Sequence, residues 1–337
     1  MNRREFLKVC TIGVLLASCK KVTTFPKENQ LTFFPVIMQG KTIALPLGVQ
    51  IEHHQAQSVK QWIIPNRQYQ IPIKWRDVET VRGIYDWSLY DPDFEALAGQ
   101  KVTAGIKVVP EWARLWKGYV ASPPKPLCFY DLANFVIKVI ERYHVDAVEL
   151  FNEPDVDLIS TIPYAEYFGA WCISSDWYMG GTRYGQCLNA IYPVIHAAYP
   201  NVRIIAGALI GGIPSSIEFL QGAINTGLRC DAISFHKYIG LGGNFNSAFE
   251  FGKLVKQKIN KPQVLSETGI TSSIDSLELQ QAQAGYLKYL KQNYRTSTVS
   301  VIQWYSLANN GWMNTDLVRN NESTLAYKEF IREVEHR

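Results

Sequence analysis

Residues 131–151 read DLANFVIKVIERYHVDAVELF, and this stretch decides the fold. In its first part, Asp131–Tyr143, apolar residues recur every three or four positions, which predicts an amphipathic helix. We expect Asp131 to cap the amino end of that helix. The second part, Val145–Phe151, is a short apolar run with β-branched residues, typical of a buried strand. A helix that leads directly into a buried strand is the repeating unit of α/β proteins. One helical face carries Leu132, Phe135, Val136, Val139 and Ile140.

The same alternation continues in both directions along the chain and gives eight strand candidates. Eight is the strand number of the (β/α)8 barrel, in which each parallel strand is followed by a helix. An open, doubly wound sheet is the rival fold, but it usually carries a glycine-rich phosphate turn after its first strand. The glycine-rich run of this chain, Gly240–Gly243, follows a late strand instead. The sequence therefore predicts the α/β class and a (β/α)8 TIM barrel, as a single domain over residues 45–337. The predicted strands are Leu45–Ile51, Gln68–Lys74, Val102–Val109, Val145–Phe151, Val202–Ala208, Asp231–His236, Gln263–Glu267 and Val299–Trp304.

Length and composition agree with one large globular domain. The chain has 337 residues, and a barrel of this kind typically needs about 250. Hydrophobic residues make up 47% and charged residues 19% of the chain, which is ordinary for a protein with a sizeable core. There are 34 basic and 30 acidic side chains, so the formal net charge is only +4. This weak excess, with no basic stripe, predicts no nucleic-acid partner.

The amino terminus has the pattern of an export signal. Residues 1–8 (MNRREFLK) are basic, and Val9–Ala17 is an apolar run far shorter than the ~20 residues that a membrane-spanning helix needs. Leu16-Ala17-Ser18-Cys19 resembles a lipobox, and Arg3–Lys8 resembles a twin-arginine export motif. We therefore expect a signal peptide over residues 1–18, a lipidated Cys19 and a tether to residue 44. This predicts a membrane-anchored lipoprotein that faces the periplasm or the cell surface. The alternative is a plain secretory signal in which Cys19 is incidental.

Four of the six cysteines lie beyond this leader. In an oxidising compartment they could form two bridges, and Cys172 with Cys187, on either side of Gly180-Gly181, is the most plausible pair. Four buried free thiols are the alternative. No C-x-x-C pair occurs, and adjacent histidines such as His53-His54 cannot easily face one metal from a strand. We expect no metal site and no cofactor. The four cysteines are Cys128, Cys172, Cys187 and Cys230.

Carboxylates, amides and aromatic rings follow the predicted strands, where a barrel of this kind carries its chemistry. Aromatic rings can stack on the apolar faces of pyranose sugars, and carboxylates and amides can bond their hydroxyl groups. Any one of these residues could be an ordinary polar group at a strand end, but the whole set favours a sugar site. The set comprises Glu52, His53, Trp75, Arg76, Glu111, Trp112, Asn152, Glu153, His236, Tyr238, Glu267, Trp304 and Tyr305.

Two of these strand ends resemble a known group of enzymes. The segment VELFNEPDV (148–156) is similar to the Asn-Glu-Pro signature of the clan A glycoside hydrolases, and VLSETGI (264–270) is similar to their nucleophile strand. Further similar segments lie in the expected order, so that the resemblance covers roughly residues 45–332. It is closest to the β-xylosidase/iduronidase family and its relatives that cut exopolysaccharides. The further segments are WRDVETVRGIYDW (75–87), PEWAR (110–114), FHKY (235–238) and QWYSL (303–307) with Gly311-Trp312.

The resemblance implies an activity and a role for each site residue. Clan A enzymes are retaining, and the match makes Glu153 the acid/base and Glu267 the nucleophile, in a carboxylate pair separated by about 5–5.5 Å. Asn152 would bond the sugar 2-hydroxyl, and Tyr238 would steady the nucleophile. The expected protein is a monomeric retaining β-glycoside hydrolase with a poly- or oligosaccharide substrate. The alternative is a glycan-binding surface lipoprotein on the same fold, without turnover. Further substrate contacts are expected from His236, which could instead bond a carboxylate, from Trp304 as the platform under the sugar, and from Trp112, Glu52 and His53.

The sequence departs from the clan pattern on the second strand. Many relatives carry an arginine there that supports the nucleophile, and the matching position here is Gln70. Arg67, Lys74 or Arg76 would have to substitute, or the support is absent. Glu79 is expected to brace a strand to a helix.

The segment after the fourth strand, residues 155–186, is long and rich in aromatic residues. Connections of this size are usually functional or contain small helices of their own. It could wall an elongated cleft, which would favour internal cleavage of a polymer. Alternatively, its rings could only pack a helix onto the barrel.

Overall fold

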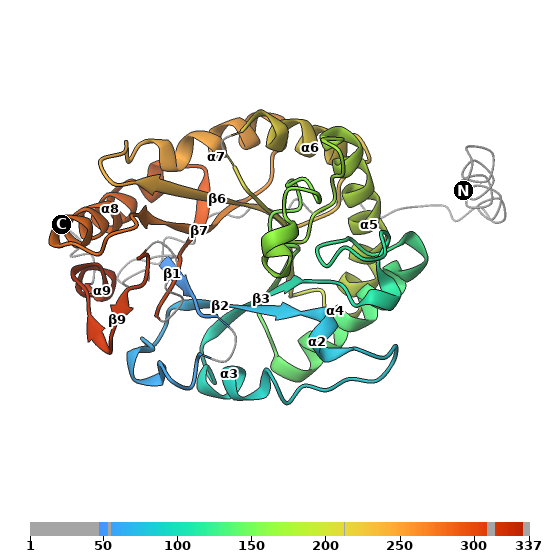
Figure 1. Cartoon of the computed structure of the whole chain (residues 1–337), viewed down its shortest axis with the longest axis horizontal. Helices are drawn as coiled ribbons and strands as arrows, with labels where there is room; N and C mark the ends of the chain where they lie inside the picture. Colours follow the sequence, from blue (N-terminus) through green and yellow to red (C-terminus); the bar gives the residue numbers. More distant parts are fainter. Residues whose placement is uncertain (1–46, 53–54, 212, 309–313, 333–337) are drawn as a thin grey trace. The chain divides into compact units, whose positions relative to one another are not determined.

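The computed structural model describes residues 47–52, 55–211, 213–308 and 314–332, all of which belong to one compact unit, Ala44–Arg337. Within them, eight parallel strands pair in chain order and close into a barrel, because β1 pairs with both β2 and β8 (Figure 1). The predicted (β/α)8 barrel is confirmed. The expectations for the signal peptide, Cys19, the tether, His53 and Gly311-Trp312 concern residues outside the described ranges.

All eight predicted strands are present. Two of them, β6 and β7, run four residues beyond the predicted ends at His236 and Glu267, to Gly240 and Thr271. Tyr238 and Glu267 are therefore held within the sheet rather than on loops. The strands are β1 (Leu47–Gln50), β2 (Gln68–Lys74), β3 (Lys101–Lys107), β4 (Ala147–Leu150), β5 (Arg203–Leu209), β6 (Ala232–Gly240), β7 (Gln263–Thr271) and β8 (Val299–Trp304).

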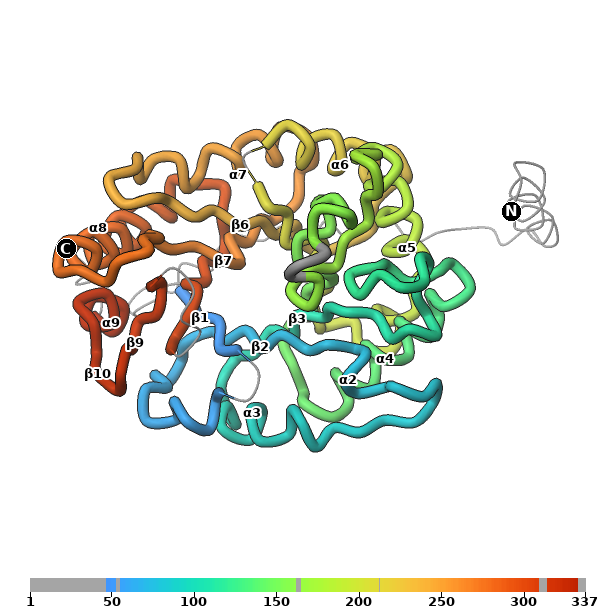
Figure 2. The backbone as a smooth tube through the Cα atoms, viewed as in Figure 1, coloured from blue at the N-terminus to red at the C-terminus, as the bar shows by residue number. Residues whose placement is uncertain are grey.

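Helices surround the strands, as the tube through the backbone makes clear (Figure 2). Within the described residues, no helix is both long enough and apolar enough to cross a membrane. The short strands β9 (Val318–Arg319) and β10 (Glu322–Ser323) form a hairpin before the last helix. The α-helices are α2 (Trp75–Val78), α3 (Asp91–Ala96), α4 (Phe129–Tyr143), α5 (Trp177–Ala198), α6 (Pro214–Ile224), α7 (Ser247–Lys258), α8 (Leu277–Asn293) and α9 (Leu325–Ile331). The 3-10 helices are η1 (Lys60–Trp62), η2 (Glu111–Ala113), η3 (Pro126–Cys128), η4 (Ile162–Tyr167) and η5 (Tyr294–Thr296).

Helix α4 starts earlier than the sequence predicts. It begins at Phe129, directly after η3, and so Asp131 lies in its first turn rather than at the cap. The Asp131 carboxylate instead accepts two hydrogen bonds from the Arg82 guanidinium, at 2.9 and 3.0 Å. The predicted cap was wrong because the helix begins two residues before Asp131, which leaves its carboxylate to pair with Arg82.

The core has one layer inside the barrel and one outside it. Small apolar side chains fill the amino-terminal end of the barrel interior, where a larger side chain on each strand would not fit. Outside the barrel, aromatic rings join neighbouring helices and loops: Phe135 of α4 stacks on Trp75 of α2 and on Trp87, with ring centroids 5.5 and 5.8 Å away. The interior apolar layer consists of Ala147, Ile205, Ala232, Val264 and Val301.

The predicted bridge between Cys172 and Cys187 is absent, and all four cysteines of the described region are buried free thiols. The reason is the position of Cys187 within α5. Cys172 packs beside Gly180, near the start of this helix, whereas Cys187 follows Gly180 by seven residues along it. Seven helical residues rise by about 10 Å, well beyond the ~4.4–6.8 Å that separate the Cα atoms of a disulfide.

The outer aromatic layer gives a stability prediction. We expect Phe135→Ala to lower the free energy of unfolding by about 3–5 kcal/mol, because it opens a cavity between two tryptophan rings. Leu127→Ala is the matched control: Leu127 lies just before α4 and is 84% exposed, so its loss should cost less than about 0.5 kcal/mol. Urea unfolding followed by tryptophan fluorescence would measure both. Equal losses in the two variants would contradict the packing described here.

Candidate active site

The backbone takes an unusual course at the end of β4. Phe151 and Glu153 have left-handed φ values of 69° and 45°, and Val108, after β3, has φ 49°. Such values are uncommon outside glycine, are rarest for β-branched residues, and cluster at functional sites. The Glu153 amide donates a 2.9 Å hydrogen bond to the Ala208 carbonyl of β5. This turn directs the Glu153 side chain toward the barrel axis instead of continuing the strand.

Strands β6 and β7 bring two further predicted residues together. Their register shifts between Phe235 and His236, and beyond this shift His236 lies opposite Glu267. Both side chains are almost completely buried. The irregularity therefore sets which residues of the two strands face the site.

The two predicted catalytic carboxylates meet at His236. Its Nδ1 lies 2.9 Å from Glu153 Oε1 and 3.5 Å from Glu267 Oε2. Because both oxygens approach the same nitrogen, they are at most about 6.4 Å apart, below the ~6.5–9.5 Å typical of inverting carboxylate pairs. The Tyr238 hydroxyl donates a 2.6 Å hydrogen bond to Glu267 Oε2. The structure thus places Glu153, Glu267, His236 and Tyr238 in one cluster.

Burial and neighbouring charges shift the proton affinities of this cluster. Burial raises the pKa of Glu267 to about 7, although the His236 charge and the Tyr238 hydroxyl both favour its ionised form. For His236 burial disfavours the charged ring, but Glu267 and Glu153 outweigh it and raise its pKa to about 9. At neutral pH the imidazolium therefore offsets part of the negative charge of the carboxylate pair.

Glu52 and Tyr305 extend the cluster across β1 and the end of β8. The Tyr305 hydroxyl donates a 3.1 Å hydrogen bond to Glu52 Oε1, which also accepts one of 3.0 Å from Gln50 Nε2. The Tyr305 ring stands edge-on to Tyr238, with their centroids 6.0 Å apart. Glu52 is thus present at the site as predicted. The sequence indicates Tyr305 only as a residue at a strand end, and the structure adds its contact with Glu52.

The assignment of Trp304 as the sugar platform was wrong. Its side chain is fully buried, its Nε1 donates a 2.8 Å hydrogen bond to the Thr315 carbonyl, and its ring packs near Tyr286. Neighbouring residues of a strand face opposite sides of the sheet. Trp304 therefore packs into the core, and the next residue, Tyr305, faces the site.

Trp112 takes part in packing in this structure. Its Nε1 donates a 3.0 Å hydrogen bond to the Glu79 carbonyl, and its ring stands edge-on to Trp75. The Glu79 carboxylate accepts hydrogen bonds from Trp75 Nε1 at 2.6 Å and from the Gly83 amide at 2.7 Å. Glu79 is therefore structural, but it braces α2 to the loop that follows rather than a strand to a helix. The contacts of Trp112 join it to that brace rather than to the carboxylate pair.

Asp155 is a supporting residue that the sequence did not reveal. It is fully buried two positions after Glu153, and it accepts hydrogen bonds from the Ile210 amide at 3.0 Å and the Ser216 hydroxyl at 2.5 Å. These contacts join the β4 turn to the end of β5 and to α6. Burial raises the pKa of Asp155 to about 6, although the two donors favour its charged form. Its place in the Asn-Glu-Pro-Asp run was the available signal.

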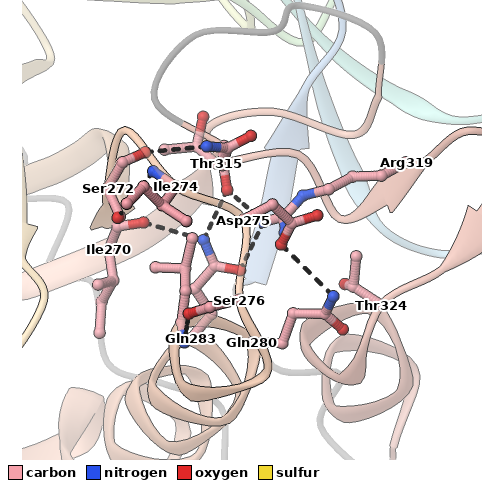
Figure 3. A network of polar contacts seen from close by, with 12 residues as sticks. Ile270, Ser272, Ile274, Asp275, Ser276, Gln280, Gln283, Thr315, Arg319 and Thr324 are labelled. Atoms are coloured by element: carbon pink, nitrogen blue, oxygen red, sulfur yellow. Dashed lines mark hydrogen bonds and ion pairs between the residues drawn. The ribbon is translucent and has the colours of Figure 1, made fainter.

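A second brace holds the carboxyl end of β7. Gln283 of α8 donates hydrogen bonds to the carbonyls of Ile270 and Asn314, at 2.9 and 2.8 Å (Figure 3). Arg319 donates to the Gln283 side-chain oxygen at 2.8 Å and pairs with the Asp275 carboxylate. The strand that carries Glu267 is thereby tied to α8 and to the hairpin near the carboxyl terminus.

The three cations considered as substitutes for the missing arginine contact other groups. Lys74 and Arg76 pair with Glu166, and Arg67 lies over the Phe330 ring. Gln70 Nε2 donates a 2.9 Å hydrogen bond to Glu149, which is buried in the barrel interior. Within the described ranges, the cationic side chain that contacts Glu267 is His236.

The long segment after β4 mainly packs a helix onto the barrel. Trp171 and Tyr184 are buried against Phe151, with centroids 5.3 and 6.4 Å away, as the packing alternative predicted. Tyr167, in contrast, is 54% exposed, and its carbonyl accepts a 2.9 Å hydrogen bond from Asn152 Nδ2. The part of this segment near Asn152 therefore lies beside the site.

A small cavity lies beside Glu267, which lines it together with Asn152, Glu149, Lys107 and others. Across the described residues, no group of three or more histidine, cysteine or acidic side chains is arranged to hold a metal ion.

Several solved structures share this fold. A family 39 glycoside hydrolase from the gut symbiont Bacteroides cellulosilyticus WH2 has a TM-score of 0.61 and 16% identity, over 85% of this chain but only 62% of that protein. A psychrophilic family 10 endo-β-1,4-xylanase has a TM-score of 0.62 and 14% identity, over 84% of this chain and 95% of its own. An endo-β-1,3-glucanase of family 128 from Sorangium cellulosum has a TM-score of 0.53 and 15% identity, over 86% of this chain and 99% of its own. No family model and no curated protein matches the sequence. At these identities the likeness establishes the fold, and the resemblance to clan A hydrolases is confirmed at that level.

The cluster at His236 gives a prediction for the Glu267 proton. In Tyr238→Phe the ionised carboxylate loses a donor, so the pKa of Glu267 should rise from about 7 by about one pH unit or more. A titration of 13C-labelled glutamate by NMR would measure this, with the Glu267 signal assigned by its loss in Glu267→Gln. Tyr286→Phe is the control, because that buried hydroxyl bonds Thr268 outside the cluster. An unchanged or lower pKa in Tyr238→Phe would refute the role given to the phenol.

Proposed function

We propose that this protein is a retaining β-glycoside hydrolase that acts on a poly- or oligosaccharide. The observation that carries the proposal is the approach of Glu153 and Glu267 to one imidazole nitrogen, which keeps their facing oxygens closer than the ~6.5–9.5 Å typical of inverting pairs. The fold shared with xylan- and β-1,3-glucan-cleaving enzymes supports a carbohydrate substrate.

In the first step, Glu267 acts as the nucleophile. One of its carboxylate oxygens attacks the anomeric carbon, the bond from that carbon to the leaving oxygen breaks, and Glu153 gives its proton to the leaving oxygen. The donors of Tyr238 and His236 favour the ionised form that Glu267 needs. Because burial holds the Glu267 pKa at about 7, this step should weaken as the pH falls below that value.

In the second step, Glu153 acts as the base. It takes a proton from water, the water oxygen attacks the anomeric carbon, and the bond to Glu267 breaks. Two displacements at one carbon leave its configuration unchanged. In this proposal Asn152, directly before Glu153, bonds the sugar 2-hydroxyl. Tyr305 and Glu52 border the pair. In this proposal Tyr305 replaces Trp304 as the aromatic residue nearest the reacting sugar.

Azide separates the two carboxylate roles. Glu267→Ala should lose natural turnover, and azide should enter its gap to give a glycosyl azide of inverted configuration. Glu153→Ala should still react with activated aryl glycosides, and azide should then give the retained product. Loss of general acid assistance should slow poor leaving groups by about 10²–10⁴-fold. NMR of the azide products would establish their configuration.

The control for this experiment is Glu218→Ala, at an exposed position of α6 outside the site, which should keep full activity. Inverted azide from Glu153→Ala with retained azide from Glu267→Ala would reverse the two roles. Full activity in both site variants would refute the glycosidase proposal.

We further propose that Cys19 is lipidated and anchors the protein outside the cytoplasm. The support is the sequence pattern alone, a short apolar run that is followed by Ser18 and Cys19. Cells fed a clickable fatty acid should label the wild-type protein and leave Cys19→Ala unlabelled. If Cys19→Ala takes up label and stays with the membrane fraction, the anchor lies elsewhere.

A further inference from the structure

A largely buried lysine lines the small cavity beside Glu267. Lys107 is the last residue of β3 and is only 5% exposed, and it shares the cavity lining with Glu267 and Asn152. In the part of the chain that the structure describes, its ammonium makes no hydrogen bond or ion pair, and it lies 5.8 Å from the centroid of the Tyr167 ring. The side chain is largely buried, but the Lys107 nitrogen itself is not fully enclosed. A negative group of a ligand can therefore approach it without displacing a protein partner.

Glu149 is the acidic side chain of the cavity that could form an ion pair with Lys107. It lines the same cavity, but its carboxylate accepts a hydrogen bond from Gln70 and forms no ion pair with Lys107 within the described structure. Lys107 therefore remains the cation without a direct partner at the mouth of the barrel.

A second lysine lies next to Lys107. In the sheet register Lys74 of β2 is opposite Lys107. Lys74 Nζ lies 3.0 Å from one Glu166 oxygen, and Arg76 Nη2 lies 3.2 Å from the other, while Arg76 also pairs with Asp77. Glu166 comes from η4, and its side chain is half exposed. Lys74 is mostly buried, but Glu166 reaches the solvent, so a ligand carboxylate can compete with Glu166 for Lys74.

We propose that Lys107 and Lys74 form an anion-recognition subsite beside the catalytic pair, and that the substrate carries a carboxylated sugar such as a uronic acid. This inference rests on the proposed glycosidase function, since it names the substrate class of that same site. Glu166 shows that a carboxylate fits against Lys74, and the unpaired Lys107 supplies the second cation. Asn152 and Glu267 on the same cavity place this subsite within reach of the reacting sugar.

Matched pairs of polysaccharides test the proposal. Alginate, hyaluronan and glucuronoxylan would each be compared with their carboxyl-reduced forms, in which carbodiimide and borohydride convert each carboxylate into a neutral hydroxymethyl group. Initial rates give kcat/KM for any form that is cut, and equilibrium binding to the full chain gives Kd for any form that is not. At least one charged form should be preferred over its reduced form by about tenfold or more, and less so at high salt.

Lys107→Met keeps the length of the side chain and removes its charge, so it should lower that preference ratio by about tenfold or more. Lys101→Met is the matched control, because Lys101 is exposed at the opposite end of the same strand. It should keep the wild-type ratio.

The possible outcomes separate this inference from the proposed function. Equal cleavage of charged and reduced forms would overturn the subsite and leave the glycosidase intact. Chondroitin sulfate would be tested as well. If its binding depends on its sulfate groups rather than on its carboxylates, the assignment to carboxylated sugars is wrong. The absence of binding to every charged form would also overturn that assignment. Lys107-dependent binding without cleavage of any form would support the subsite and refute the glycosidase.

Discussion

Two acidic side chains converge on one buried imidazole, and the rest of the site is arranged to make this possible. Bringing two carboxylates together away from water is unfavourable through both desolvation and repulsion. His236 offsets this by facing both of them, which requires the β6–β7 register shift and the left-handed turn at Glu153. Asp155 and Gln283 then hold the two carboxylate-bearing segments from outside the cluster. These contacts involve two different helices, α6 through Ser216 and α8 through Gln283, so the site depends on more of the barrel than any one loop.

The barrel interior changes character along its axis. Small apolar residues close the amino-terminal end, and above them come polar side chains such as Gln50, Gln70 and Glu149. Gly105, on β3 between these polar neighbours, contributes no side chain and so leaves space for the cavity that Lys107 and Glu267 line. A packed lower half and an open, charged upper half let one barrel serve both stability and recognition.

Apolar runs in the sequence predicted the strands, and the residues that follow them predicted the set of side chains at the strand ends. The resemblance to clan A hydrolases then singled out Glu153 and Glu267 within that set. The sequence could not predict which face each residue presents. Trp304 and Tyr305 are adjacent, and only the position of β8 in the closed sheet decides that the first packs against helix α8 and the second borders the site. The role of His236 between two carboxylates and the unpaired Lys107 depend in the same way on neighbouring strands. Cys187 illustrates a different limit, since helix geometry rather than spacing in the sequence keeps it from Cys172.

The buried titratable groups also affect folding itself. Asp155, Glu267 and His236 have folded pKa values of about 6, 7 and 9, each above its ordinary value of 3.8, 4.5 or 6.5. A group of this kind holds its proton in the native state at pH values where the unfolded chain has released it, so folding takes up protons. The contribution of each group to stability is complete below its unfolded pKa and declines as the pH rises through the folded one. From about pH 4 to pH 9, at least one of the three is in that window. The arrangement that poises the site for acid–base chemistry thus makes the native state a proton acceptor, which mildly acidic surroundings stabilise.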